Sequence, residues 1–493
     1  MADDILTNLA NGFNSVEKFE IPTLQGSDSQ NPDHQIEIGD DPSRQGPLLR
    51  SRKKNKEEEK SLYKPKVETS KRWTIFRVPA HIREVDEKAY DPKIVSIGPL
   101  HCNKPCLKAM EAQKLRFVNR ILEHVALSKA DLERPMHELE GQTRECYSEN
   151  FEDMSSNEFI QMMVLDACFI VELLRLYEKS CEGKDVEEPI FGTRSMIPII
   201  VRDLLMLENQ LPMFVLQRMY DLLITNYCST SCSSTTLNKL ALRFFEPFRL
   251  GRDEISSERL NTTETYSHLL DLFQSRFVPS PDHPSMKQKE TWSIDDERLP
   301  GKGWINNATK LTFAGIELRG KSSSPLLDLN FHGHVLEIPT LFLDDGSGPL
   351  LRNLLAFEQS NRYAKPYFTC LAIFFDSIVD TTNDINILRN AGVIKQAKGG
   401  NDEILQLLNS LTRELEFDME DCYITEQVER INLFCRTTRA RIRTIFRTFI
   451  KRFDILNGAL TYISLIQTIV FILASVSGPD TEMKSAQAPA PSA

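Results

Sequence analysis

The sequence predicts a mainly α-helical fold with a small β-hairpin component (α+β): one large helical domain followed by a single carboxy-terminal transmembrane helix. Three patterns lead to this prediction. Apolar residues recur at helical spacing over much of the chain, one stretch alternates around a glycine, and the apolar run Ile455–Val476 holds no charged residue. The expected parts are a disordered polar leader (1–70), the helical domain (71–453), the transmembrane helix (454–476) and a short disordered tail (477–493).

Composition and charge limit the possible functions. The 493 residues allow a large core, and 41% apolar with 26% charged residues is typical of a globular protein. The net charge of −11 argues against a generic nucleic-acid-binding protein, so no nucleic-acid partner is expected. The ten cysteines are scattered, which indicates reduced and buried thiols rather than a disulfide scaffold.

The amino-terminal leader is polar and carries a run of charges at Arg50–Lys60. Such a segment cannot bury enough apolar surface to offset the entropy lost on ordering, which predicts disorder. Its basic part, Arg50–Lys56, has the composition of a nuclear-import signal, although the three glutamates that follow favour a solvated charge run.

Local patterns predict the elements of the helical domain. Leu107–Val118 and Phe159–Leu174 have the spacing of helices with an apolar face, and Leu350–Phe357 returns to a helix. Ile94–His101 has the composition of a short strand that ends in a turn. Leu326–Leu343 alternates around a His-Gly pair, which predicts a β-hairpin followed by a strand that a proline ends.

The apolar run Ile455–Val476 is the basis for the predicted membrane anchor. Its 22 uncharged residues would extend about 33 Å as a helix, enough for a hydrocarbon core of about 30 Å. The alternative is a carboxy-terminal helix buried in the core, because Asn457, Ser464 and Gln467 make insertion less favourable.

A basic stripe precedes this run. Cations recur at steps of four and would share one face of a helix, while apolar side chains would form a second face. The cations are Arg439, Arg443, Arg447 and Lys451, and the apolar residues are Ile442, Phe446, Phe449 and Phe453. This pattern predicts a helix on anionic lipid headgroups, with a single-pass anchor, a cytosolic body, and a plasma-membrane or endomembrane location.

No complete catalytic or metal-binding motif stands out. Gly315–Ser322 matches the phosphate-binding pattern G-x-x-x-x-G-K-[ST], but a strand-like stretch follows where that motif requires a helix. His101 with Cys102 and Cys106, and the pair Cys228 and Cys232, have spacings too common to indicate zinc. We therefore expect no catalytic residue, cofactor or metal.

Two short stretches place polar groups among apolar ones, DLLMLENQ (203–210) and RNLLAFEQ (352–359). If helical, they would pair carboxylates with arginine across two helices, completed by amides, as a buried structural network. Asp166, in a third apolar stretch, would find an arginine from Arg144, Arg175 or Arg202. The expected network residues are Asp166, Asp203, Glu208, Asn209, Gln210, Arg352, Asn353, Glu358 and Gln359.

The chain resembles the plant-specific family that carries the domain of unknown function 247. The resemblance rests on these stretches, in chain order: VPAHIREVDEKAYDPKIVSIGPLH (78–101), LKAMEAQKLRF (107–117), RECY (144–147), MMVLDACFIVE (162–172), DLLMLENQLPMFVL (203–216), HLLDL (268–272), ATKLTFAGIEL (308–318) and RNLLAFEQ (352–359). It implies a helical domain with a carboxy-terminal anchor and no established catalytic activity. Some grass members are implicated in self-incompatibility, others in growth or stress responses.

Three hypotheses follow. The first is a membrane-anchored, non-enzymatic recognition or signalling protein, whose surface loops, such as that between Phe277 and Trp304, bind a protein partner. The second is a hydrolase-like enzyme in which Asp203, Glu208 and Glu358 converge on one open cleft. The third is a soluble or nuclear regulatory factor that buries its last apolar helix.

Overall fold

The computed structural model describes residues 73–102, 104–227, 235–248, 250–251, 265–278, 303–322, 325–396, 399–417 and 422–476. Within the last range, the side chains of residues 453–459 and 471–476 are not described. The predicted leader with Arg50–Lys56, the tail 477–493, and nearly all of the loop between Phe277 and Trp304 lie outside the described residues.

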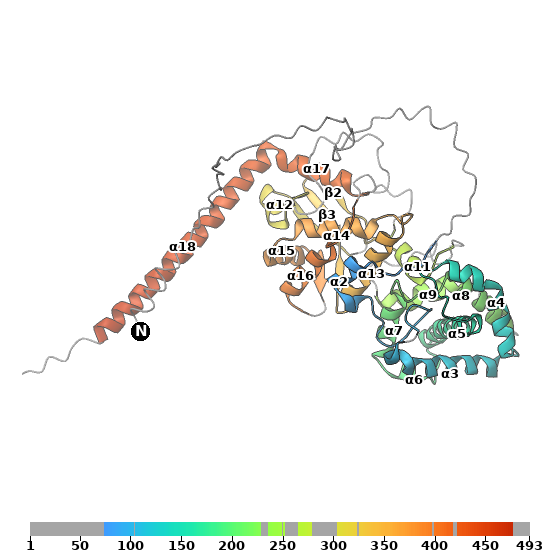
Figure 1. Cartoon of the computed structure of the whole chain (residues 1–493). Helices are drawn as coiled ribbons and strands as arrows, with labels where there is room; N and C mark the ends of the chain where they lie inside the picture. The colour runs from blue at the N-terminus through green and yellow to red at the C-terminus, as the bar shows by residue number, and fades with distance from the viewer. Residues whose placement is uncertain are drawn as a thin grey trace, which may run out of the picture. The chain divides into compact units, whose positions relative to one another are not determined.

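The described chain is mainly helical with a small sheet component, as predicted (Figure 1). One group of helices surrounds α5 (Ser156–Cys181), whose apolar residues occur on all sides and are buried. A capping box between Ser155 and Glu158 starts α5. The helices packed on it are α3 (Lys108–His124), α4 (Lys129–Glu145), α8 (Met213–Tyr227) and α9 (Leu237–Phe245).

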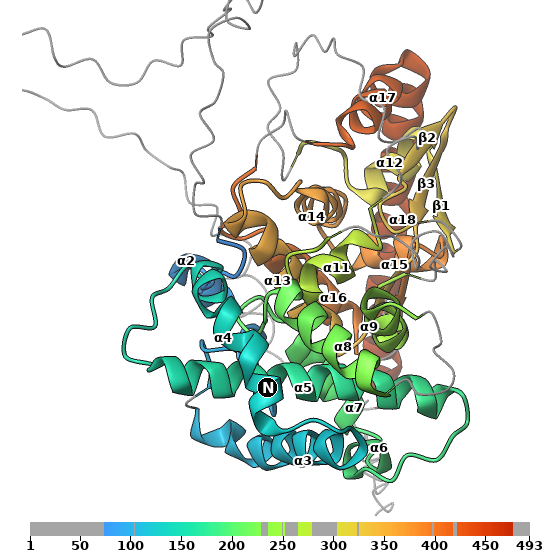
Figure 2. The same cartoon turned by 90° about the vertical axis from the view of Figure 1, so that its right-hand side faces the viewer.

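Of the remaining helices, α6 (Pro189–Gly192) and α7 (Met196–Leu204) lie beside α3 and α5, and the others form a second group at the other end of the body, connect the two groups or follow them (Figure 2). The α-helices are α2 (Ala80–Val85), α6 (Pro189–Gly192), α7 (Met196–Leu204), α11 (Leu269–Ser275), α12 (Ala308–Ala314), α13 (Ser347–Ser360), α14 (Tyr367–Ile378), α15 (Thr382–Asn390), α16 (Asn401–Leu411), α17 (Thr425–Arg436) and α18 (Thr438–Val476). Short 3-10 helices are η2 (Glu87–Ala89), η3 (Pro105–Leu107) and η4 (Glu246–Phe248).

The predicted hairpin is confirmed. The strands β2 (Asn330–His332) and β3 (Val335–Pro339) pair antiparallel, and Gly333 in the turn has φ of 64°, which favours glycine. The strand β1 (Glu317–Lys321) pairs parallel with β3, and Pro339 ends β3. A second, two-stranded sheet pairs β4 (Leu341–Leu343) in parallel with β5 (Ile394–Gln396).

Two local predictions are wrong. The strand predicted within Ile94–His101 is absent, because its backbone N–H groups bind side chains instead of a neighbouring strand, although the predicted turn follows at residues 98–100. The helix over the first polar stretch ends at Leu204, so Glu208, Asn209 and Gln210 lie in the irregular turn that follows. The phosphate-loop match opens no helix, as expected: Gly315 caps α12, and the strand β1 begins at Glu317.

The long helix α18 covers the predicted anchor segment, which is therefore helical over Ile455–Val476. Its first half contacts α12 and α17. In its second half, the described side chains of Leu460–Val470 are all exposed, so burial of these residues in the core is excluded. Among the residues that the structure describes, no helix is both long enough and apolar enough to cross a membrane.

Candidate functional site

Asp203, at the end of α7, binds the backbone of the amino-terminal segment, which we define as residues 74–101. Its carboxylate accepts hydrogen bonds from the backbone N–H groups of Lys93, Ile94 and Val95 at 2.8–3.1 Å. The guanidinium of Arg202 lies 3.0 Å from the same carboxylate. Burial outweighs these donors and raises the pKa of Asp203. The acid therefore takes the place of a neighbouring strand.

The two amides of the first polar stretch act on backbone as well. Asn209 accepts a hydrogen bond from the N–H of Ile97 at 2.7 Å. Its amide NH₂ group donates to the carbonyl oxygens of Val95 and Asp203. Gln210 accepts from the N–H of Leu270 in α11, and its own carbonyl oxygen accepts from the hydroxyl of Tyr147 at 2.9 Å. Asn209 and Gln210 thereby connect this turn to the amino-terminal segment, to Tyr147 and to α11.

The second polar stretch, in α13, meets the first through an amide rather than through an ion pair. Asn353 accepts from the N–H of Leu207 and donates to the carbonyl oxygen of Ala89, both at 2.9 Å. Arg352 does not pair with an acid of the first stretch: its Nε lies 3.3 Å from a carboxylate oxygen of Asp86. The expected carboxylate–arginine pairing between the two stretches is therefore wrong.

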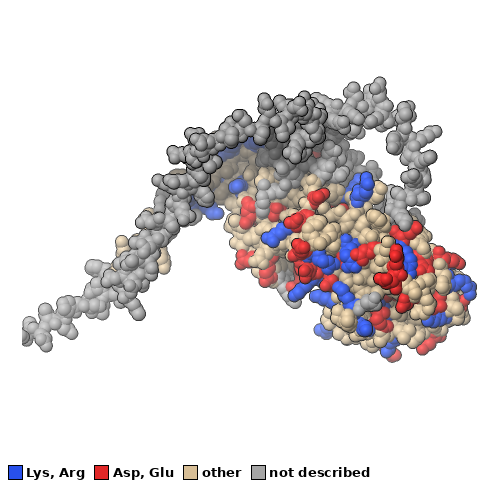
Figure 3. Space-filling model, in the orientation of Figure 1, with Lys and Arg blue, Asp and Glu red and all other residues tan. Residues whose placement is uncertain are grey.

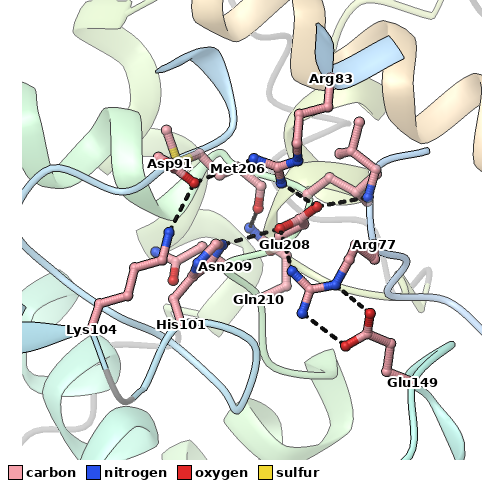
Figure 4. Close-up of polar contacts among 12 residues, drawn as sticks. Arg77, Arg83, Asp91, His101, Lys104, Glu149, Met206, Glu208, Asn209 and Gln210 are labelled. Carbon is pink, nitrogen blue, oxygen red and sulfur yellow. Dashed lines mark hydrogen bonds and ion pairs between the residues drawn. The ribbon is translucent and has the colours of Figure 1, made fainter. Parts of the chain in front are cut away.

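Glu208 is the centre of a charged cluster at the edge of the core (Figure 4). Its side chain is fully buried, and Oε1 accepts from the N–H of Val78 at 2.7 Å and from Arg83 at 2.5 Å. Arg77 and His101 lie 3.5 and 3.3 Å from Oε2. Burial raises the pKa of Glu208, but hydrogen bonds from His101 and Arg83 outweigh it and hold the pKa below its usual value.

Asp166, inside α5, pairs with Lys114 of α3. The predicted arginine partner is therefore wrong. The carboxylate lies 2.6 Å from Nζ of Lys114 and accepts from the N–H of Gly98 at 2.8 Å. Burial raises the pKa of Asp166 to about 6, against the opposing effect of the ammonium group. Gly98 has φ of 71°, and a Cβ there would lie 2.6 Å from the carbonyl oxygen of Gln210, so only glycine fits.

Glu358 joins α13 to the start of α14. Its carboxylate accepts from the N–H groups of Phe368 and Thr369, from the Thr369 hydroxyl and from Gln274, at 2.6–2.8 Å. Burial outweighs these donors and raises the pKa of Glu358 to about 7. The neighbouring Gln359 exchanges two hydrogen bonds with the backbone of Glu416.

The acids of this set have their polar atoms directed at the chain's own donors. None of Asp166, Asp203, Glu208 and Glu358 lines any of three cavities, of about 270, 10 and 10 Å³, within the described part of the molecule. They are also divided among separate clusters. The single open cleft that the enzyme hypothesis requires of Asp203, Glu208 and Glu358 is therefore not found among these cavities.

Sequence reasoning missed several members of these clusters. The side chain of Lys114 is only 2% exposed, because Lys114 lies on the apolar face of α3 between Met110 and Phe117. A lysine at such a position is a signal that a buried acid faces it. No comparable pattern marks Arg83 or His101, because they act from loops and short helices.

The predicted membrane-surface residues all lie in the first half of α18: Arg439, Arg443, Arg447 and Lys451. Two of them reach across the carboxyl-terminal end of α12. Arg447 donates to the carbonyl oxygen of Thr312, and Arg443 lies so close to Gly315 that a Cβ there would collide with it. Cations are favoured at a helix carboxyl end. Elsewhere, Figure 3 shows acidic and basic side chains interspersed on the visible face of the body.

The weak metal-site patterns do not come together. No group of three or more His, Cys, Asp or Glu side chains is placed to hold a metal ion within the described ranges. His101 lies beside Glu208, Cys106 is exposed, and Cys228 and Cys232 lie outside the described residues.

Fold and site define a class of protein: a helical body with a small sheet, in which buried acids and amides bind the backbone of the amino-terminal segment. The chain belongs to the family DUF247, described as a plant protein of unknown function, whose model matches residues 75–474.

Two relatives are similar over most of their length. UPF0481 protein At3g47200 of Arabidopsis thaliana is 28% identical over 383 residues, which cover 73% of this chain and 77% of that protein. Putative UPF0481 protein At3g02645 of the same plant is 21% identical over 443 residues, covering 73% and 82%. No solved structure matches the chain.

Proposed function

We propose that the protein is a membrane-anchored, non-enzymatic interaction protein, in which the helical body is a rigid scaffold and α18 attaches it to lipid. The observation that carries this proposal is the exposure of α18. Each described side chain of Leu460–Val470 is exposed, including Leu465 at 58% and Val470 at 59%. A contiguous apolar surface of this kind in water is unfavourable, and its usual explanation is a protein or membrane contact.

The buried acids support the non-enzymatic half of the proposal. A general acid or base must come within hydrogen-bond reach of a substrate. The side chains of Asp203 and Glu208 are fully buried, and their oxygens already face backbone and arginine donors. We therefore assign these residues to the scaffold, where they fix the amino-terminal segment on the helices.

In this proposal, Ile455–Val476 is a single-pass anchor. The basic residues before it, Arg439, Arg443, Arg447 and Lys451, favour a cytosolic body, because cations are retained on the cytosolic side of an anchor. The membrane is the plasma membrane or an endomembrane. The partner is a protein that the body recognises, in a signalling or self-incompatibility role like that implied by the family resemblance.

The test compares the full chain with a chain that ends at Phe453. Plant membranes that contain either form are extracted with alkaline carbonate, and the pellet is assayed for the protein. We expect the full chain in the pellet and the truncated chain in the supernatant. Release of the full chain by carbonate would contradict the anchor, and retention of both forms would move the attachment away from α18.

Orientation needs a separate assay, because Asn307-Ala308-Thr309, which matches the N-glycosylation pattern N-x-[ST], is a poor reporter. The Asn307 side chain accepts from the N–H of Lys310 and donates to Asp380, so its amide is already engaged in capping α12. A tag placed after Ala493 and challenged with protease in sealed vesicles is more direct. We expect protection of the tag while the body is digested, and the reverse pattern would place the body on the far side.

A further inference from the structure

A cavity of about 270 Å³ opens where α12, α17 and α18 meet. It is the largest of the three cavities described above. Its lining combines apolar side chains with polar and basic ones. The lining residues are Asn306, Lys310, Ala314, Cys435, Arg441, Thr444 and Ile445.

The charge of this cavity is purely positive. Lys310 and Arg441 are exposed cations, one on α12 and one on α18, and the lining contains no acid. Within the described part of the chain, neither cation forms an ion pair. The Asn306 amide adds a further donor, whereas the Thr444 hydroxyl already donates to the carbonyl oxygen of Ala440. An anion would therefore meet three unused donor groups.

The cavity borders an exposed apolar ridge on α18, which we define as Ile442, Ile445, Phe446 and Phe449. Their side chains are 61–70% exposed. At about 100° per residue, the ridge lies opposite Ala440, Thr444 and Arg447, which form the face directed at α12. Ile445 belongs to both the ridge and the cavity wall. A cationic cavity is thus continuous with an apolar surface that points away from the body.

We propose that this cavity binds the phosphomonoester headgroup of an anionic lipid, while the ridge enters the boundary between headgroups and acyl chains. This inference rests on the proposed membrane attachment and names its lipid. A phosphomonoester carries a charge of about −1.5 to −2 at neutral pH, which two cations match. The guanidinium of Arg441 supplies planar paired donors, and the ammonium of Lys310 a compact charge.

This arrangement also constrains the orientation of α18. Ile445 precedes Ile455 by ten residues, or about 15 Å of helix, whereas one headgroup layer is about 5–8 Å deep. An upright helix would hold the cavity above the headgroups. The first half of α18 must therefore lie along the surface, with a bend or tilt near Gly458, where glycine weakens the helix. The body contacts the opposite face of α18 and therefore stays in water.

The test is a titration of the full chain in detergent micelles, so that its outcome does not depend on the anchor. The probes are dioctanoyl phosphatidylinositol 4-phosphate, dioctanoyl phosphatidylserine and soluble inositol 1,4-bisphosphate. We expect the phosphomonoester lipid to bind about tenfold more tightly than either of the other two, because only it combines a phosphomonoester group with acyl chains. Equal affinity for phosphatidylserine would overturn the headgroup assignment, and equal affinity for the soluble bisphosphate would make the ligand a free phosphate compound.

Two variants of equal charge assign the binding to the cavity. K310Q/R441Q removes the two cavity cations, and R439Q/R452Q removes two exposed cations of α18 that do not line it. We expect the first to weaken binding of the phosphomonoester lipid by about tenfold or more, and the second by no more than about threefold. Equal losses would mean general attraction of anions and would overturn the proposal.

Cys435 provides a second readout inside the cavity. Bound lipid should slow alkylation of Cys435, while the exposed Cys106 and Cys181 keep their rates and show that the reagent remains equally active. K310Q/R441Q should abolish this protection. If the lipid leaves the Cys435 rate unchanged, the headgroup is not in this cavity. Carbonate extraction remains the separate test of the anchor, so failure of one proposal is distinguishable from failure of the other.

Discussion

The amino-terminal segment (residues 74–101) and the apolar ridge of α18 break the usual distribution of residues in opposite ways. Around the first, buried acids and amides bind its backbone, since Asp203, Glu208, Asn209 and Asp166 accept hydrogen bonds from N–H groups of that segment. In the second, apolar side chains are exposed. These acids and amides therefore have partners inside the body, whereas the ridge leaves apolar surface in water at a cost that a membrane would remove.

The two regions differ in whether the unusual side chains find partners within the protein. A buried carboxylate that accepts several N–H donors replaces a strand ladder and holds irregular backbone in place. Exposed apolar side chains form no such hydrogen bonds and leave their surface in water. Substitutions at the first region should therefore change stability, and substitutions at the second should change attachment.

The largest expected effect is at the Lys114–Asp166 pair. Lys114→Met leaves the Asp166 carboxylate buried without its cation, which should lower the free energy of unfolding by about 3–5 kcal/mol. The double variant K114M/D166L should recover most of that loss. Urea unfolding followed by circular dichroism measures both. Lys129→Met, at an exposed lysine, is the control, and a loss as small as in this control would remove the structural role of the pair.

Asp203→Asn is next. The amide retains one acceptor oxygen but turns an NH₂ group toward the donors of Lys93, Ile94 and Val95, so we expect a loss of about 3 kcal/mol. Unfolding midpoints in urea provide the measurement, with Asp153→Asn at an exposed site as the control. Unchanged stability would indicate that the amino-terminal segment is held by its apolar contacts alone.

The sequence predicted the elements whose pattern depends on neighbouring residues. The periodicity of α5 and the alternation around Gly333 predicted a helix and a hairpin, because both depend on neighbours in sequence. A strand was predicted within 94–101, since composition cannot reveal that the partners of this backbone are side chains more than 60 residues away.

The polar residues themselves were predictable, but their partners were not. Acids and amides inside apolar stretches indicate buried hydrogen bonding on energetic grounds alone. The choice of Lys114 for Asp166, or of Asp86 for Arg352, depends on tertiary packing. The cavity between α12 and α18 left no local pattern, because its cations come from helices more than 100 residues apart.

A smaller effect is expected from pH. Burial raises the pKa of Glu358 from 4.5 to about 7, so the folded protein holds this proton more tightly than the unfolded chain. The contribution of Glu358 to stability is complete below pH 4.5 and is lost as the pH rises through about 7, by up to about 3 kcal/mol. Glu358→Gln should lack this slope. If unfolding midpoints of wild type and variant run parallel from pH 4.5 to pH 8, the carboxyl group is ionised throughout.

The smallest effect on stability is expected at the ridge. The double variant I442S/F446S should change the free energy of unfolding by no more than about 0.5 kcal/mol, because both side chains are exposed. Ile431→Ser, in the buried face of α17, is the contrasting control and should cost more than about 2 kcal/mol. A large loss in the double variant would show that the ridge packs within the protein in solution.

Hydrogen exchange of the full chain, with and without vesicles that contain phosphatidylinositol 4-phosphate, tests both regions in one measurement. We predict that the backbone amides of Ile94, Val95, Ile97 and Gly98 exchange as slowly as those of α5, although they belong to no helix or strand, and that vesicles do not change them. Amides of residues 442–450 should exchange more slowly when vesicles are added than in their absence. Fast exchange in the amino-terminal segment, or exchange in α18 that ignores lipid, would contradict the account.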